Sequence, residues 1–286
     1  MAITTQETFP VLVMCGSDRK RRKLLQVHDP EGKYPSKALL PFLGKRVIDW
    51  QLEALHDSPY VDRIYLLGLT PEMAEFQMPV EYIPVSVDSS LLEKMLTGLE
   101  FLEKELPDLD HLVVSTSDTP GMSTRSIDQF FQALVEHPEK DLFLSAVPED
   151  SLKGVFSDAG RVVGRFRDQA VFPGELFAMR PKVILSKQDV IQSLSSLRRD
   201  FDRSQTRIPL GPILRYLARK PVLWPALLRY QRGTLTISQA EKAVSSAFDL
   251  QAKAVIIDDP GFGMDMDLPE DYHKLERYVR ERKLKS

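Results

Sequence analysis

The sequence predicts an α/β protein whose mixed, mostly parallel sheet is covered by helices on both faces. Short apolar runs typical of buried strands alternate with segments whose apolar residues recur at helical spacing, and this alternation extends over residues 11–147. The length of 286 residues suffices for a large core without disulfides or metals. The composition, 43% hydrophobic and 28% charged, is typical of globular proteins.

The elements of the first half follow from these patterns in order. Apolar runs predict strands over 11–14, 64–67, 111–115 and 142–147. Apolar residues at helical spacing predict helices over 45–57, 92–102 and 127–134. Strands that alternate with helices in this way indicate βαβ units.

The pattern changes after Pro148. Short strands are predicted over 162–166 and 176–179, and the turn signal Pro173-Gly174 separates them. Residues 187–248 are predicted to be mainly helical.

Two further elements complete the chain. Ser238 and Glu241 have the spacing of a capping box at the start of a helix. A strand is predicted over 254–257, and a last helix over 269–282 begins at a proline. We interpret residues 1–286 as a single domain that contains a helical insertion at 187–250.

Charge and cysteine content exclude several classes of protein. The 38 basic and 41 acidic residues give a formal net charge of −3, so nucleic acid is not an expected partner. A single cysteine allows no internal disulfide. No apolar run reaches the roughly 18 residues that span a bilayer, and residues 1–10 carry no apolar signal core. We expect a soluble, cytoplasmic protein with no membrane partner.

Three segments are expected to meet at one edge of the sheet. Cys15 to Ser17 follow the first strand, Asp118 follows the third, and Asp265 follows the last. Ligands of open α/β sheets bind beyond the carboxyl ends of the strands, which parallel strands place at one edge. Together with Lys37, such a turn and two aspartates can hold a nucleoside triphosphate and a divalent metal ion.

The same segments resemble a known family. The motifs that carry the resemblance are Met14-Cys15-Gly16-Ser17, Pro35-Ser36-Lys37-Ala38-Leu39-Leu40-Pro41, Ser89 to Leu96, Ser117-Asp118-Thr119-Pro120, and Met264 to Asp271. They are similar to those of the nucleotidyltransferases related to the molybdenum-cofactor guanylyltransferase. That resemblance implies a Rossmann-like fold of the nucleotide-diphospho-sugar transferase (glycosyltransferase-A-like) type.

The resemblance also implies a reaction. An acceptor oxygen, usually from a phosphate, attacks the α-phosphorus of a nucleoside triphosphate, and pyrophosphate leaves. Lys37 would place a positive charge on the α-phosphate. Asp118 and Asp265 would hold Mg²⁺, the implied cofactor. Asp267 would cap or orient the last helix.

Further residues of these motifs are expected to bind the two substrates. Met14, Cys15, Gly16 and Ser17 would offer backbone groups to the nucleotide, together with Ser117. Ser89 and Ser90 would lie near the base or ribose.

Departures from the family pattern concern both substrates. Ser17 replaces a residue that usually has no side chain. Arg21 instead matches the family, because it falls where the family keeps an arginine that binds the triphosphate. Gly174 and Glu175 occupy a position where the family often has Gly-Asn and would contact the acceptor.

Two alternatives remain open on the sequence. A glycosyltransferase of the same fold would use Asp265-Met266-Asp267 as its metal motif, although that motif lies close to the C-terminus. A regulatory module that binds nucleotides without catalysis would explain Ser17 and Glu175.

Simpler interpretations apply to other residues. Cys15 is expected to be buried and unreactive, and the basic stretch 274–285 to be a solvated helix face. The expected partners are the nucleoside triphosphate and a small acceptor, and a homo-oligomer is compatible with the sequence.

Overall fold

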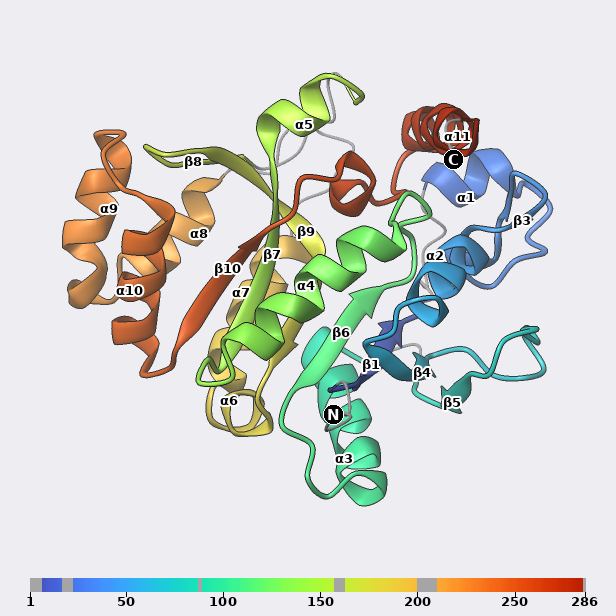
Figure 1. The fold of residues 1–286 in the computed structure, drawn as a ribbon, viewed down its shortest axis with the longest axis horizontal. Helices are drawn as coiled ribbons and strands as arrows, with labels where there is room; N and C mark the ends of the chain where they lie inside the picture. The colour runs from blue at the N-terminus through green and yellow to red at the C-terminus, as the bar shows by residue number, and fades with distance from the viewer. Residues whose placement is uncertain (1–6, 17–22, 87–88, 157–162, 200–209, 285–286) are drawn as a thin grey trace, which may run out of the picture.

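The fold is built around one twisted sheet (Figure 1). The computed structural model describes residues 7–16, 23–86, 89–156, 163–199 and 210–284. Within these ranges, eight strands form the sheet in the order β10-β7-β9-β6-β1-β4-β5, with β8 paired to β9. All neighbours are parallel except the pairs that include β9, which runs antiparallel to β6, β7 and β8. The predicted mixed, mostly parallel α/β fold is confirmed.

The elements follow the predicted alternation. The strands are β1 Phe9–Met14, β2 Pro41–Phe42, β3 Lys45–Arg46, β4 Val61–Leu67, β5 Glu81–Ile83, β6 Leu112–Thr116, β7 Leu142–Pro148, β8 Gly164–Arg165, β9 Ala170–Met179 and β10 Ala252–Ile256. The helices are α1 Lys23–His28, α2 Val47–His56, α3 Leu91–Glu105, α4 Thr124–Glu136, α5 Glu149–Lys153, α6 Pro181–Ser186, α7 Gln188–Arg199, α8 Leu210–Leu217, α9 Trp224–Gln231, α10 Ile237–Phe248 and α11 Pro269–Lys283. Short 3₁₀ turns lie at Lys37–Leu39, Pro221–Leu223 and Pro260–Gly263.

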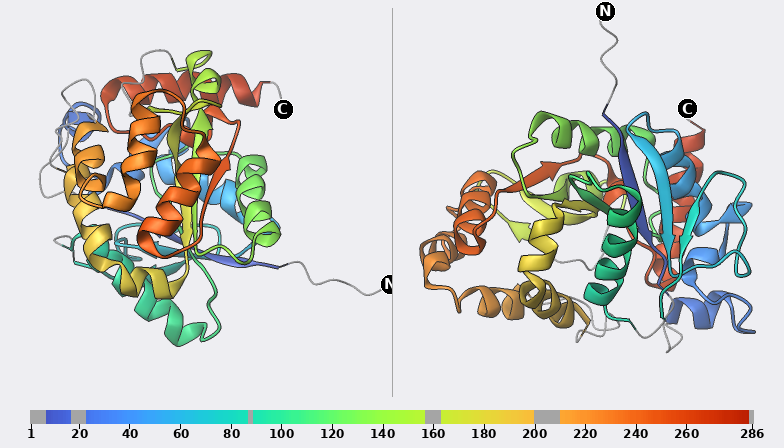
Figure 2. Two further views of the ribbon diagram at one scale, coloured as in Figure 1. Left: turned by 90° about the vertical axis from the view of Figure 1, so that its left-hand side faces the viewer. Right: turned by 90° about the horizontal axis from the view of Figure 1, so that it is seen from below.

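The central strand β1 is buried on both faces. Val11 and Val13 face one core cluster, to which α2, α4 and α11 contribute, whereas Leu12 faces a second cluster beneath α3, α6 and α10. All three side chains are fully buried. The alternation arises because successive side chains of a strand point to opposite faces. The side view shows α4 and α7 on opposite sides of the sheet (Figure 2).

Strand β9 corrects one expectation. The turn signal Pro173-Gly174 does not end a strand, because β9 continues through it from Ala170 to Met179. Pro173 pairs with Ala146 directly beside a register shift in β7, and such irregularities tolerate proline. Gly174 is required by packing, since a Cβ atom there would lie 2.4 Å from the Ser145 Oγ. Of the range 162–166, predicted to be a strand, residues 163–166 are described, and Gly164–Arg165 among them form β8.

The predicted capping box at Ser238 and Glu241 is wrong. Thr236 caps α10, and Gln239 completes the box two residues earlier than expected. The Glu241 carboxylate instead accepts a hydrogen bond of 2.7 Å from the backbone N–H of Ala254 in the edge strand β10. The spacing of a capping box fits Thr236 with Gln239 as well as Ser238 with Glu241. Because α10 begins at Ile237, Thr236 is the residue at the N-cap position.

In the described parts of the stretch 187–250 the main elements are the helices α7, α8, α9 and α10. The Asp168 carboxylate, beyond β8, accepts hydrogen bonds of 3.1 and 3.2 Å from the first N–H of α10. The division into a domain and an insertion stays a prediction. Across the described ranges, no helix has the length and apolar character needed to cross a membrane.

Two loops at the carboxyl edge pack backbone against backbone. A Cβ atom at Gly261 would lie 1.9 Å from the carbonyl oxygen of Gly121. The same carbonyl accepts a hydrogen bond of 2.5 Å from the Arg282 guanidinium in α11. Arg282 therefore departs from the expectation that residues 274–285 form only a solvated face. These contacts join the loop after β6 to the segment that follows β10.

We predict that Gly261→Ala destabilises the protein by about 2–3 kcal/mol, because the added methyl group forces the two backbones apart. Gly154→Ala is the matched control, since a Cβ atom there meets no atom within 4 Å and the backbone is helical, with φ −72° and ψ −19°. The control should change stability by less than about 1 kcal/mol, in the stabilising direction. Chemical denaturation monitored by circular dichroism measures both; equal unfolding midpoints would contradict the packing described.

Candidate active site

Three aspartates converge beyond the carboxyl ends of β6 and β10. One carboxylate oxygen from each of Asp118, Asp265 and Asp267 lies within 4.8 Å of the others. The side chains are buried, with exposed fractions of 6%, 6% and 7%. The predicted meeting of Asp118 and Asp265 at one edge of the sheet is confirmed. Asp267 was expected to cap or orient the last helix, and its presence in the cluster was not predicted.

Asp267 does not cap the last helix. Its carboxylate forms an ion pair with Lys37, whose ammonium group also pairs with Asp118. The capping role belongs to Asp271, whose Oδ2 accepts hydrogen bonds from the N–H groups of Leu268, at 2.8 Å, and of Asp267, at 3.3 Å. An acidic residue in the first turn also suits the helix dipole. Asp271 therefore fixes the backbone of Asp267 and leaves its carboxylate to the cluster.

The Lys37 segment is held rigidly against the first strand-end turn. Ser36 caps the 3₁₀ turn Lys37–Leu39, and its hydroxyl donates a hydrogen bond of 2.8 Å to the carbonyl oxygen of Gly16. Ala38 and Leu40 are fully buried and anchor the segment in the core. Lys37 is mostly buried, with 18% of its side chain exposed. The apolar run that follows the lysine in the sequence is what directs its ammonium group to the carboxylates.

The cluster brings three carboxylates together beside a lysine. In the part of the chain that the structure describes, the ammonium group of Lys37 pairs with Asp118 and Asp267, and all four groups are mostly buried. Like charges close together in a poorly solvated place repel strongly. The arrangement is therefore suited to a further cation.

A buried glutamine was missed by the sequence analysis. Gln51 in α2 is fully buried, and its amide contacts the turn that carries Asp118. A usable signal was present, because Gln51 interrupts the otherwise apolar series Val47, Gln51, Leu55 on the core face of α2.

The glycine-loop residues lie beside the cluster, as far as they are described. Cys15 is 2% exposed and Gly16 is exposed. Burial raises the pKa of the Cys15 thiol to about 12, and a hydrogen bond from Ser117 opposes this rise only in part. The thiol is thus protonated at neutral pH. Ser17 and Arg21 lie outside the described residues. Nucleotide contacts of this loop, including Met14 and Ser117, stay predictions.

The serines before α3 have structural roles. The Ser90 hydroxyl accepts a hydrogen bond of 3.1 Å from the Glu93 N–H, and the Glu93 carboxylate accepts one of 2.5 Å from the Ser90 N–H. These bonds form a capping box. The Ser89 N–H donates to the Ser86 carbonyl. A role of Ser89 and Ser90 at the base or ribose stays a prediction.

The predicted acceptor residues lie on β9. A Cβ atom at Gly174 would lie 3.1 Å from the ring of Phe262, which belongs to the turn before Asp265. Gly174 thus allows that turn to pack on the sheet. Glu175 is buried, with 5% of its surface exposed. Acceptor contacts of Gly174 and Glu175 stay predictions.

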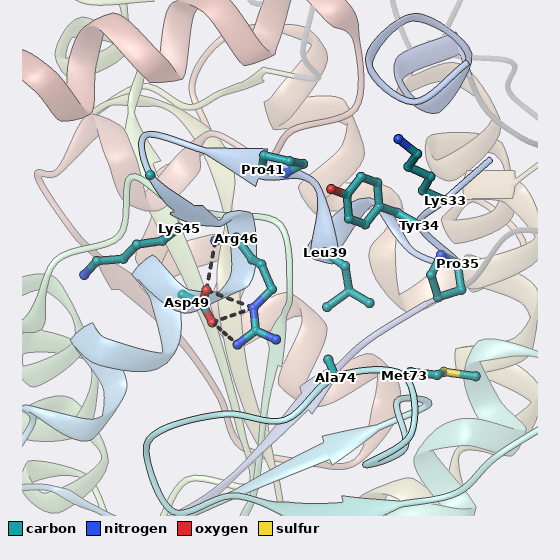
Figure 3. A pocket seen from close by; sticks show the side chains of 11 residues that line it. Lys33, Tyr34, Pro35, Leu39, Pro41, Lys45, Arg46, Asp49, Met73 and Ala74 are labelled. Atoms are coloured by element: carbon teal, nitrogen blue, oxygen red, sulfur yellow. Dashed lines mark hydrogen bonds and ion pairs between the residues drawn. The ribbon is translucent and has the colours of Figure 1, made fainter. Parts of the chain in front are cut away.

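An open pocket of about 550 Å³ lies along the segment that carries Lys37 (Figure 3). Its walls include Tyr34 and Leu39 on this segment and Met73 in the loop after β4. The guanidinium group of Arg46 is held there by Asp49 at 2.8–3.1 Å and stacks on the ring of Phe76 at 4.1 Å. None of the cluster carboxylates lines this pocket, so it is a neighbouring feature and not the cluster itself.

Sequence comparison assigns the family. The MobA-like NTP transferase domain matches residues 31–249, more than half of the chain. The chain belongs to this family. As an NTP transferase it is a nucleotidyltransferase, which confirms the resemblance drawn from the motifs. The matched range contains Lys37 and Asp118 and ends before Asp265. A comparison with curated protein sequences gives no match.

Solved structures share the fold of this NTP transferase. A hypothetical transferase from Thermus thermophilus superposes with a TM-score of 0.69 at 22% identity, over 93% of this chain and 100% of that one. CMP:2-keto-3-deoxy-manno-octonic acid synthetase complexed with CTP gives 0.51 at 14% identity, over 97% and 100%. 4-Diphosphocytidyl-2C-methyl-D-erythritol synthase from Anaerococcus prevotii gives 0.51 at 12% identity, over 96% and 99%. At these identities the likeness establishes the fold alone.

We predict that native Cys15 resists alkylation at pH 8, because the reactive thiolate is nearly absent when the pKa is about 12. Unfolding returns the pKa toward the model-peptide value of 9.0 and exposes the sulfur, so the denatured chain should react readily. The sequence has one cysteine, so a single mass shift reports the reaction. Rapid alkylation of the folded protein would contradict the described burial of Cys15.

Proposed function

We propose that this nucleotidyltransferase uses Mg²⁺ to transfer a nucleoside monophosphate from a nucleoside triphosphate to a small, phosphorylated acceptor. An acceptor oxygen forms a bond to the α-phosphorus, the bond to the β-phosphate oxygen breaks, and pyrophosphate leaves. The observation that supports this best is the meeting of Lys37 with Asp118, Asp265 and Asp267 beyond the strand ends.

The carboxylate cluster fits Mg²⁺ by its chemistry. Mg²⁺ prefers hard oxygen ligands at about 2.0–2.1 Å, so ligands on opposite sides of the ion lie about 4.2 Å apart. The three carboxylate oxygens lie within 4.8 Å of one another, which brings them near enough to share one ion. When bound, such an ion neutralises phosphate charge and orients the triphosphate. Asp118 and Asp265 are its proposed ligands, and Asp267 is available as a third.

Lys37 has to change partners during the reaction. Its ammonium group pairs with Asp118 and Asp267 in the structure. A role on the α-phosphate requires that it leave at least one of these carboxylates. The lysine stem is flexible and the ammonium group is a compact charge, so a shift within the site suffices. On the phosphate, Lys37 would stabilise the negative charge that builds up in the transition state.

The alternatives lose support. Membership of an NTP transferase family favours nucleotidyl transfer over the glycosyltransferase interpretation of Asp265-Met266-Asp267. A regulatory module without catalysis would not need a buried lysine held against the carboxylates of Asp118 and Asp267. We propose no nucleic-acid or membrane partner.

We predict that Asp118→Asn lowers the rate of pyrophosphate release by about 10²-fold or more, because a cation ligand is lost while the side-chain shape is kept. A coupled phosphate assay, with each of the four triphosphates, Mg²⁺ and a panel of phosphorylated acceptors, measures this. Asp150→Asn is the matched control, since the Asp150 side chain is 97% exposed outside the cluster. The control should turn over like the wild type; undiminished turnover by Asp118→Asn would refute the metal assignment.

We predict opposite effects of Lys37→Met on metal binding and on turnover. Without nucleotide, Mn²⁺ should bind more tightly, because the competing ammonium group is gone from Asp118 and Asp267. Turnover should nevertheless fall by about 10²-fold, because the charge on the α-phosphate is lost. Titration followed by Mn²⁺ electron paramagnetic resonance, combined with single-turnover kinetics, separates the two. Weaker Mn²⁺ binding by the variant would contradict the proposed competition.

A further inference from the structure

Gln51 lies at the centre of α2, the helix that follows the Lys37 segment. It is fully buried on a face formed otherwise by apolar side chains, among them Val47 and Leu55. A buried amide weakens a core unless hydrogen bonds satisfy its polar atoms. The bonds of this amide therefore indicate its role.

Both polar atoms of the Gln51 amide bond to the turn after β6. Nε2 donates to the Ser115 hydroxyl at 2.6 Å and to the Thr116 carbonyl at 2.5 Å. Oε1 accepts a bond of 3.2 Å from the N–H of Thr119. The amide thus holds the backbone two residues before Asp118 and one residue after it. Its amino group donates to the Thr116 carbonyl and its oxygen accepts from the Thr119 N–H, so the amide matches the opposite polarities of these two backbone groups.

The turn held by Gln51 also positions the second aspartate segment. The carbonyl oxygen of Asp118 accepts a hydrogen bond of 2.9 Å from the N–H of Met266. Met266 lies between the other two members of the cluster, Asp265 and Asp267. A shift of the turn would therefore move all three carboxylates relative to one another.

We propose that Gln51 is a positioning residue that sets the spacing of the carboxylate cluster. Its amide bonds to Ser115, Thr116 and Thr119, and it acts through the backbone on either side of Asp118. This inference rests on the proposed function of the cluster in holding a divalent cation. An apolar side chain would fill the same space but would leave the Thr116 carbonyl and the Thr119 N–H without their present partner, and the turn would relax to satisfy them.

The test uses the full-length protein and Mn²⁺ alone as the probe. Residues that orient metal ligands typically cost 10–100-fold in metal affinity or activity when they are replaced. We expect Gln51→Leu to weaken Mn²⁺ binding by about that factor, and to lower kcat by a similar factor while KM for the triphosphate changes less. Electron paramagnetic resonance gives the affinity, and circular dichroism gives the folded fraction.

Leu55→Ala is the matched control in the same helix. Leu55 is fully buried one turn further along α2 and makes no hydrogen bond to the turn. The control should lower the unfolding temperature while the folded protein keeps wild-type Mn²⁺ affinity. If Gln51→Leu does not fold, Gln51→Glu serves in its place, because it keeps the size and the acceptor for the Thr119 N–H but cannot donate to the Thr116 carbonyl when ionised.

The outcomes separate this inference from the proposed function. If the wild type binds Mn²⁺, Asp118→Asn abolishes that binding and the Gln51 variants retain it, the positioning role is overturned and the function stands. If Asp118→Asn binds Mn²⁺ as the wild type does, the proposed function fails. If Leu55→Ala weakens Mn²⁺ binding as much as Gln51→Leu, a general loss of core packing explains the effect and the positioning role is overturned.

Discussion

Repulsion between buried carboxylates is the constraint on which the rest of the site depends. Asp118, Asp265 and Asp267 are brought within 4.8 Å of one another in a place where water screens them poorly. Such an arrangement persists only with positive charge beside it and with a rigid support behind it. Lys37 provides the charge in the structure, and the sheet and its loops provide the support. The proximity of the three carboxylates is the basis of the proposed cation site.

The support consists largely of backbone contacts between distant parts of the chain. Gly121 and Gly261 bring two loops closer than side chains would allow, and the Met266 N–H joins the Asp118 carbonyl. Arg282, near the end of α11, donates to the Gly121 carbonyl. The last helix therefore contributes to the site without supplying a side chain to the cluster. The close approach requires glycine at both positions, because a Cβ atom at either one would meet the facing backbone.

Much of the fold could be predicted because local patterns and tertiary packing agree. The apolar residues of β1 indicate a strand buried on both faces, and Val11 and Leu12 do enter two different cores. The errors arise where two local interpretations fit equally well. Pro173-Gly174 is a turn signal, yet pairing with β7 keeps it within β9. Ser238 could cap a helix, yet α10 begins at Ile237 and its N-cap is therefore Thr236.

The sequence by itself determined that Asp118 and Asp265 share an edge, since each follows a strand and parallel strands end on the same side of a sheet. It also singled out Lys37 through the apolar residues that anchor its segment. Only the tertiary structure decided that Asp267 joins the cluster and that Gln51 holds the turn. Both depend on how side chains from segments far apart in the chain meet. Periodicity marks Gln51 as a polar residue on an apolar helix face, but it does not show which segment that face meets.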